Sequence, residues 1–220
     1  PGPEIKIDKS LERKGYKPLG RGEGGPGGGP VAPPGNYQVC LKLDGKEYKH
    51  SFKILKDPRL ETTSEDFAAQ FELWNKITRR VSEINGAINS IRRIMCQIEE
   101  LLSRDTLANS SSQKSVKEVR KNAETLLGKL KILENELTQT KNETPSDRLR
   151  HPAMLKERME ALVSNVSVAD SVPPQQAYDV FEHLSKQIDQ KLKQMNLVCE
   201  KDLSSLNQLI ENNGIPKLHG

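Results

Sequence analysis

The sequence predicts a mainly α-helical protein with a small β part: a β-hairpin followed by an elongated antiparallel bundle of three to four helices. Apolar residues make up 34% of the 220 residues and aromatic residues 4%, so we do not expect a large mixed core; globular proteins average about 45–50% apolar residues. After residue 64, apolar side chains recur every three or four residues, as they do in helical bundles. One stretch before residue 60 alternates apolar and polar residues, as β-strands do.

The first 36 residues contain ten glycines and seven prolines. Proline fixes φ and glycine leaves it free, so no regular element can propagate there, and we expect an extended segment over residues 1–36. The glycine-rich run 22–30 is not a phosphate-binding loop, because the Lys-Ser/Thr pair and helix start that such a loop needs do not follow it.

Residues 37–59 are predicted to contain the hairpin. Two alternating stretches flank Asp44-Gly45, a pair that favours a type I′ turn because both central positions need a positive φ. A two-residue turn pairs residue 43 with residue 46 and gathers the apolar side chains on one face. These are Tyr37, Val39, Leu41, Tyr48 and Phe52. An isolated hairpin is marginally stable, so we expect residues 1–36, the first helix or another chain to cover this face.

Residues 60–220 are predicted to form the helical bundle. Thr63 or Ser64 can cap the first helix, since acidic residues follow in its first turn. Breaks rich in proline and serine separate the later helices. The predicted helices span residues 64–103, 112–139, 152–167 and 174–212. Gly86 and Gly128 lie off the apolar stripes, where we expect them to permit a close helix approach.

Several side chains receive a structural interpretation. Phe67, Phe71 and Trp74 are predicted to pack between the hairpin and the bundle. Cys96 and Cys199 lie on or next to the apolar stripes, so we expect both to be core residues.

Histidines and acidic residues form no recognisable site. The four histidines stand at positions 50, 151, 183 and 219, with no HExxH motif and no cysteine cluster. His50 shares the apolar face of the hairpin, and we expect it to be a partly buried structural residue. Acidic residues alternate with Lys and Arg on helix faces, as Asp189 does with Lys193, which indicates solvated ion pairs. The sequence therefore predicts no catalytic, cofactor-binding or metal-binding residues, no cofactor, and a chain that is not an enzyme.

Composition bears on location and partners. No run of about 18 apolar residues exists, so no membrane span is expected, and no signal peptide is visible. The chain starts with Pro1 rather than Met, so we expect a processed chain or a part of a longer protein. The formal charge of +4 is too diffuse to suggest a nucleic-acid partner. Three cysteines are too few and too scattered for a disulfide framework or a cysteine zinc site.

The residues around the hairpin carry a resemblance to a known family. The pattern is PPG-x-Y-x-V-x-L followed by DG and DPR over residues 33–59, and then a long helix. The helix continues the pattern through Asp66-Phe67, Gln70-Phe71, Asn85-Gly86-Ala87-Ile88 and Ile91-Arg92. The chain resembles the C-terminal region of large bacterial secreted proteins with a sortilin-like, BNR-repeat (sialidase-like) β-propeller, which are often labelled glycosyl hydrolases. The later helices match more loosely.

That resemblance implies a fold and a role. In the family, the hairpin ends an Ig-like β-sandwich, the helices form a terminal bundle, and any hydrolase site lies in propellers that this chain lacks. It also implies a location outside the cytoplasm: periplasmic, cell-surface or secreted. We therefore expect a non-catalytic structural module that acts as a spacer, docking or oligomerisation element. Its expected partners are the remainder of the parent polypeptide, a companion β-propeller or Ig-like subunit, or a second copy.

Two alternatives remain open. The chain could be an accessory domain that completes the substrate cleft of a sialidase-like propeller hydrolase. It could also be an adaptor-type bundle that binds a partner helix, which predicts an unfilled apolar stripe on the bundle surface.

Overall fold

The computed structural model describes residues 29–103, 114–142, 144–212 and 218. The predicted fold class is confirmed, since the protein is mainly helical with one two-stranded antiparallel hairpin. Most of the predicted extended segment 1–36 lies outside the described residues. The elements in chain order are β1 (Gly35–Leu43), β2 (Lys46–Ile54), α1 (Ser64–Ser103), α3 (Lys114–Leu137), η2 (Pro145–Leu149), α4 (Leu155–Val166), α5 (Gln175–Val198), η3 (Cys199–Leu203) and α6 (Ser204–Asn212).

The hairpin forms in the predicted register. β1 pairs with β2 so that Tyr37 lies opposite Phe52, and the two rings stack with their centroids 5.9 Å apart. Asp44 (φ 49°) and Gly45 (φ 75°) both have a positive φ, as a type I′ turn requires. The apolar side chains of Tyr37, Val39, Leu41, Tyr48 and Phe52 therefore share one face, on which His50 also lies.

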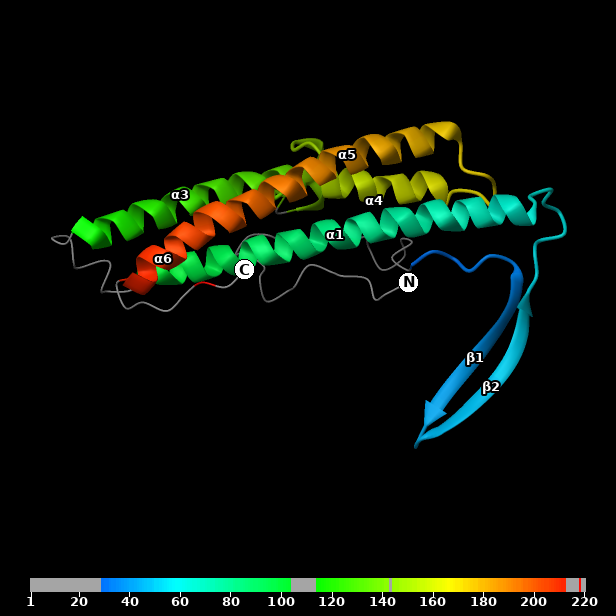
Figure 1. The fold of residues 1–220 in the computed structure, drawn as a ribbon. Coiled ribbons are helices and arrows are strands. Elements are labelled where there is room, and N and C mark those ends of the chain that lie inside the picture. Colours follow the sequence, from blue (N-terminus) through cyan, green and yellow to red (C-terminus); the bar gives the residue numbers. More distant parts are fainter. Residues whose placement is uncertain (1–28, 104–113, 143, 213–217, 219–220) are drawn as a thin grey trace.

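The helices form three rods that lie side by side, as Figure 1 shows. α1 is the first rod, α3 and α4 follow each other in the opposite direction as the second, and α5 with α6 returns alongside α1 as the third. Contacts connect α1 with α3, α4 and α5, and α5 with α3 and α4, so the rods enclose one elongated core. The hairpin extends away from one end of this bundle.

The predicted apolar stripes form that core. Each helix turns its stripe toward its neighbours, because a repeat near 3.5 residues keeps the same face inward. The stripe of α5 is buried at Leu184 and Ile188 and half-buried at Phe181, Leu192 and Met195. α1 buries a second set of residues as well, since it contacts both other rods. That set is Leu73, Ala87, Ile94 and Leu101.

Polar groups fix the helix ends and the rod contacts. Thr63 caps α1 reciprocally with Asp66: its backbone N–H donates to Asp66 Oδ2 (2.9 Å), and its Oγ1 accepts from the Asp66 N–H (3.1 Å). Arg80 of α1 reaches the third rod, where it donates to the Ser185 carbonyl (2.8 Å) and pairs with Asp189. Asp189 thus pairs with Arg80 across the rods and not with Lys193 of its own helix.

Glu157 joins the two halves of the second rod. Its carboxylate accepts hydrogen bonds from Thr138 Oγ1 (2.7 Å) and the Gln139 N–H (3.2 Å) just after α3. It also accepts from the Met154 N–H (3.1 Å) at the start of α4. One side chain therefore satisfies donors at both sides of the break between the helices.

An ion pair is buried between α1 and α3. Arg92 Nε lies 2.6 Å from Glu134 Oε1, and both side chains are 2% exposed. Charged side chains are almost never fully buried unless they are paired. The pair therefore fixes which turns of α1 and α3 face each other.

The third rod contains a π-helical segment, η3. Its apolar stripe advances by four residues twice in succession, from Met195 to Cys199 and on to Leu203. The same two steps of four occur from Leu184 to Ile188 to Leu192 within the regular helix α5, so the spacing alone does not account for the π turn. Beyond the π turn, Leu206 and Ile210 of α6 remain buried.

Several expectations about single residues are wrong. His50 is exposed, because the hairpin face on which it lies is not covered by any described element. Cys96 is exposed on α1, whereas Cys199 is half-buried and packs against the core as expected. Gly86 and Gly128 permit no close helix approach, since a Cβ atom at either position would meet nothing within 4 Å.

Candidate functional site

In the described part of the chain, the His, Cys, Asp and Glu residues form no group of three that could hold a metal ion. His183 contacts Gln187 one turn further along α5 (3.2 Å), and His50 stands alone on the hairpin. Among the described helices, none has the length and apolar character that crossing a membrane requires.

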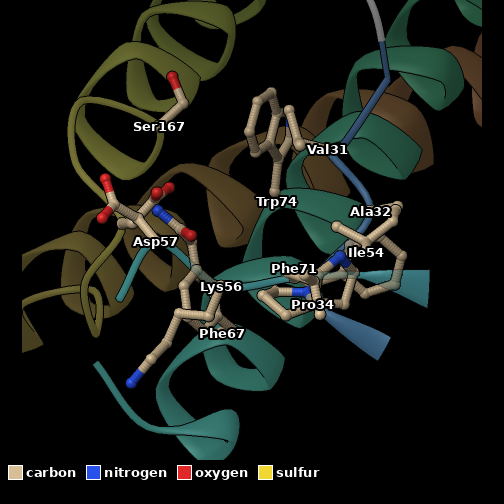
Figure 2. A pocket seen from close by; sticks show the side chains of 14 residues that line it. Val31, Ala32, Pro34, Ile54, Lys56, Asp57, Phe67, Phe71, Trp74 and Ser167 are labelled. Atoms are coloured by element: carbon tan, nitrogen blue, oxygen red, sulfur yellow. The ribbon is translucent and has the colours of Figure 1, made fainter. Parts of the chain in front are cut away.

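The junction between the hairpin and the bundle contains a pocket of about 620 Å³. Three parts of the chain line it: the two legs of the hairpin at 31–34 and 54–57, the first turns of α1, and the loop between α4 and α5. Figure 2 shows these side chains converging from both legs and from α1.

Three aromatic side chains of α1 form one wall of the pocket. Phe67, Phe71 and Trp74 stand four and three residues apart, so they share one helix face. Phe67 and Trp74 are 8% and 6% exposed, and Phe71 is half-buried. Pro33 and Pro34 of the first leg also line the pocket. The expected packing between hairpin and bundle is therefore present, but it leaves a cavity.

Hydrogen bonds attach the α4–α5 loop to the start of α1. The buried Gln70 amide donates to the carbonyls of Val166 (2.7 Å) and Ala169 (2.6 Å). The Thr62 hydroxyl donates to the carbonyl of Asp170. This side of the pocket is consequently held in place by α1 itself.

The second leg of the hairpin is held by charged side chains. Lys56 Nζ donates to the Thr62 carbonyl (3.0 Å). Arg59 donates to Asp57 through Nη2 (2.7 Å) and Nε (3.1 Å), and the hydrogen bond from the Arg59 side chain lowers the pKa of the Asp57 carboxyl. Lys56 and Asp57, the two charged residues of this leg that line the pocket, thus both form hydrogen bonds within the chain.

Beyond these legs, the hairpin stands alone. β1 and β2 contact each other but no described helix. Apolar side chains on the shared face are 45–59% exposed; these are Val39, Leu41, Tyr48 and Phe52. On the opposite face Glu47 pairs with Lys42 (2.8 Å) and Lys49 (3.2 Å). The hairpin thus has one apolar and one charged face, both open to solvent in the described structure.

The sequence anticipated part of this site. It placed Phe67, Phe71 and Trp74 at the junction, but it gave no indication of Gln70 or Asp170 as pocket residues. Gln70 bonds a loop almost a hundred residues later, and no local pattern reports such a contact. Comparison of the chain with family models, with curated proteins and with solved structures finds no match in any of the three.

Proposed function

We propose that this chain is a non-catalytic structural and interaction module, forming the C-terminal part of a larger secreted β-propeller protein. The bundle serves as a spacer, and the hairpin is the docking or oligomerisation element. Its partner is the remainder of the parent polypeptide or a companion β-propeller or Ig-like subunit, outside the cytoplasm. The uncovered apolar face of the hairpin carries this proposal.

An apolar sheet face in water is energetically costly. Burial of one large apolar side chain contributes about 1.5–3 kcal/mol. The four side chains that begin roughly half exposed would therefore contribute about 3–6 kcal/mol when a partner covers them, which approaches the whole stability of a small domain. Antiparallel sheets with one apolar and one polar face are typically covered on the apolar side.

The bundle suits a spacer. α1 has 40 residues, which corresponds to a rod of about 60 Å. The apolar stripes of the bundle helices pack against one another in the contacts among the three rods. This arrangement gives no support to the adaptor alternative, which needs an unfilled stripe on the bundle surface.

Hydrogen exchange tests the docking role. In the isolated chain, we expect the hairpin amides to exchange with little protection, because an uncovered hairpin is marginally stable. In the native protein from which the chain derives, the same amides should be protected. The amides of α1 provide the internal control, since their core environment is the same in both samples. If the native protein has an intact mass near 24.7 kDa, the apolar face of the hairpin is covered by a separate subunit. If the mass is larger, the face is covered by another part of the same polypeptide.

Two matched substitutions locate the docking face. Leu41→Lys lies on the apolar face and should abolish hairpin protection in the native protein. Ser51→Lys lies on the opposite face and should leave it unchanged. Hairpin amides that are as protected as those of α1 in the isolated chain would refute the proposal.

A further inference from the structure

The hairpin has two outer edges that no described element covers. Figure 1 shows it standing clear of the bundle, and β1 and β2 contact each other but no described helix. A strand at the edge of a sheet presents unpaired backbone N–H and C=O groups, which are a template for pairing with a further strand. Each edge here is nine residues long and has no bulge, because the pairs between β1 and β2 follow one another without a gap.

The register determines which backbone groups point outward. A type I′ turn joins its flanking residues, here Leu43 and Lys46, by a hydrogen bond. Bonded pairs then alternate with non-bonded pairs along an antiparallel ladder, and residues of the non-bonded pairs direct their N–H and C=O groups away from the hairpin. These residues are Asn36, Gln38, Cys40 and Lys42 on β1, and Glu47, Lys49, Ser51 and Lys53 on β2.

The two edges differ in charge. On β2, three of the four outward-directed residues are charged: Glu47, Lys49 and Lys53. Charged side chains on an edge, lysine above all, discourage pairing with another strand. On β1 only Lys42 is charged, and it lies next to the turn, where it pairs with Glu47 (2.8 Å). The rest of the β1 edge is exposed, uncharged and without proline, so β1 has the edge that is open to a further strand.

We propose that the outer edge of β1 pairs with an extended strand of the partner's β-sheet, so that the hairpin adds two strands to that sheet. This inference rests on the proposed function and specifies how the partner is held: by backbone hydrogen bonds along β1 in addition to burial of the apolar face. The partner strand continues the alternation of the hairpin, with apolar side chains on the face that contains Val39. Its side chains on the opposite face are uncharged or acidic, because three lysines and one glutamate of the hairpin lie on that face.

Hydrogen exchange at single amides tests this pairing. In the isolated chain, we expect the outward amides of both strands to exchange rapidly. In the native protein from which the chain derives, the amides of Gln38, Cys40 and Lys42 should exchange at least about tenfold more slowly, because exchange then requires the partner strand to separate. The outward amides of Lys49 and Ser51 should exchange at the same rate in both samples.

The same measurement separates this pairing from the docking role of the apolar face. The amides of Val39 and Leu41 point toward β2, so they gain protection whenever a partner stabilises the hairpin. If they are protected in the native protein but the outward amides of β1 are not, the edge pairing is overturned and the docking role stands. If neither set is protected, both proposals fail.

A different occupant of the edge would also be visible. Protection of the outward β1 amides in the isolated chain that rises with its concentration would assign the edge to a second copy. Protection of the outward β2 amides in place of those of β1 would assign the partner to the other edge. Either result would overturn the proposal.

Two proline substitutions provide a matched pair. Gln38 and Ser51 lie opposite each other in a non-bonded pair, so proline at either position removes an outward N–H and keeps the hydrogen bonds between β1 and β2. In the native protein, Gln38→Pro should return the Cys40 and Lys42 amides to their rate in the isolated chain, whereas Ser51→Pro should leave them protected. Equal protection in both variants would contradict the pairing. The comparison of the unsubstituted native protein with the isolated chain decides the proposal independently of both variants.

Discussion

The buried ion pair between α1 and α3 gives the sharpest prediction about stability. Arg92 and Glu134 are each 2% exposed and lie 2.6 Å apart. Removing one member leaves the other charge buried without its counter-ion, which typically costs about 3–5 kcal/mol. We therefore expect Glu134→Leu or Arg92→Met alone to lower the free energy of unfolding by about that amount. This is a large fraction of the roughly 5–15 kcal/mol available to a folded domain.

The double variant separates charge from packing. Arg92→Met with Glu134→Leu removes both charges and keeps side chains of similar size, so its stability should lie near or above that of the native chain. The sum of the two single losses should then exceed the loss in the double variant by at least about 3 kcal/mol. Urea unfolding followed by far-UV circular dichroism measures all three values.

A surface pair supplies the matched control. Arg120 and Glu124 are roughly half exposed on α3, one turn apart, with 3.1 Å between Nε and Oε1. Substituting them in the same way should change stability by only about 0.3–0.5 kcal/mol. If Glu134→Leu costs no more than Glu124→Leu, the charges of the core pair are solvated and the reasoning from burial is wrong.

Three further predictions concern individual side chains. Glu157→Gln should destabilise the chain by about 1–3 kcal/mol in urea unfolding, because the carboxylate that accepts from Thr138 and from both sides of the α3–α4 break is lost. The hydrogen bond from the Thr63 backbone N–H lowers the pKa of Asp66 below its ordinary value of 3.8. The ionised Asp66 carboxylate therefore stabilises the folded chain above that value, and this stabilisation is lost as pH falls through the folded-state pKa. The difference in free energy of unfolding between Asp66→Asn and the native chain should consequently shrink in acid titration. Iodoacetamide at mildly alkaline pH should label exposed Cys40 before Cys199, because burial raises the pKa of the Cys199 thiol; peptide mass mapping over time would contradict this if both label at one rate.

Local patterns predicted the elements, because each depends on residues close together in the chain. Asp44-Gly45 determines the hairpin register through the positive φ of both residues, and the alternating steps of three and four determine which helix faces are buried. The cap at Thr63 follows from the same kind of local signal. α1 begins at Ser64, next to the cap at Thr63.

Long-range polar contacts could not be predicted in this way. Arg92 lies four residues after Ile88 and three before Met95, so the stripe places it next to the core, but the pattern does not indicate which residue pairs with it. Glu134 likewise lies four residues after Leu130 and three before Leu137, but no local signal joins it to Arg92, which is 42 residues earlier. The π-helical segment could not be predicted either, because two successive steps of four occur around Ile188 in the regular helix α5 as well as around Cys199.

The uncovered hairpin face is where sequence pattern and structure diverge most. A slip of one residue in the register would have exposed the wrong face, but the pairing of Tyr37 with Phe52 excludes a slip. The helices cannot be the cover either, because their apolar stripes already pack against one another. The face thus has the alternation of a covered sheet and the correct register, but no described element covers it. These properties favour the interpretation that the face is an interface.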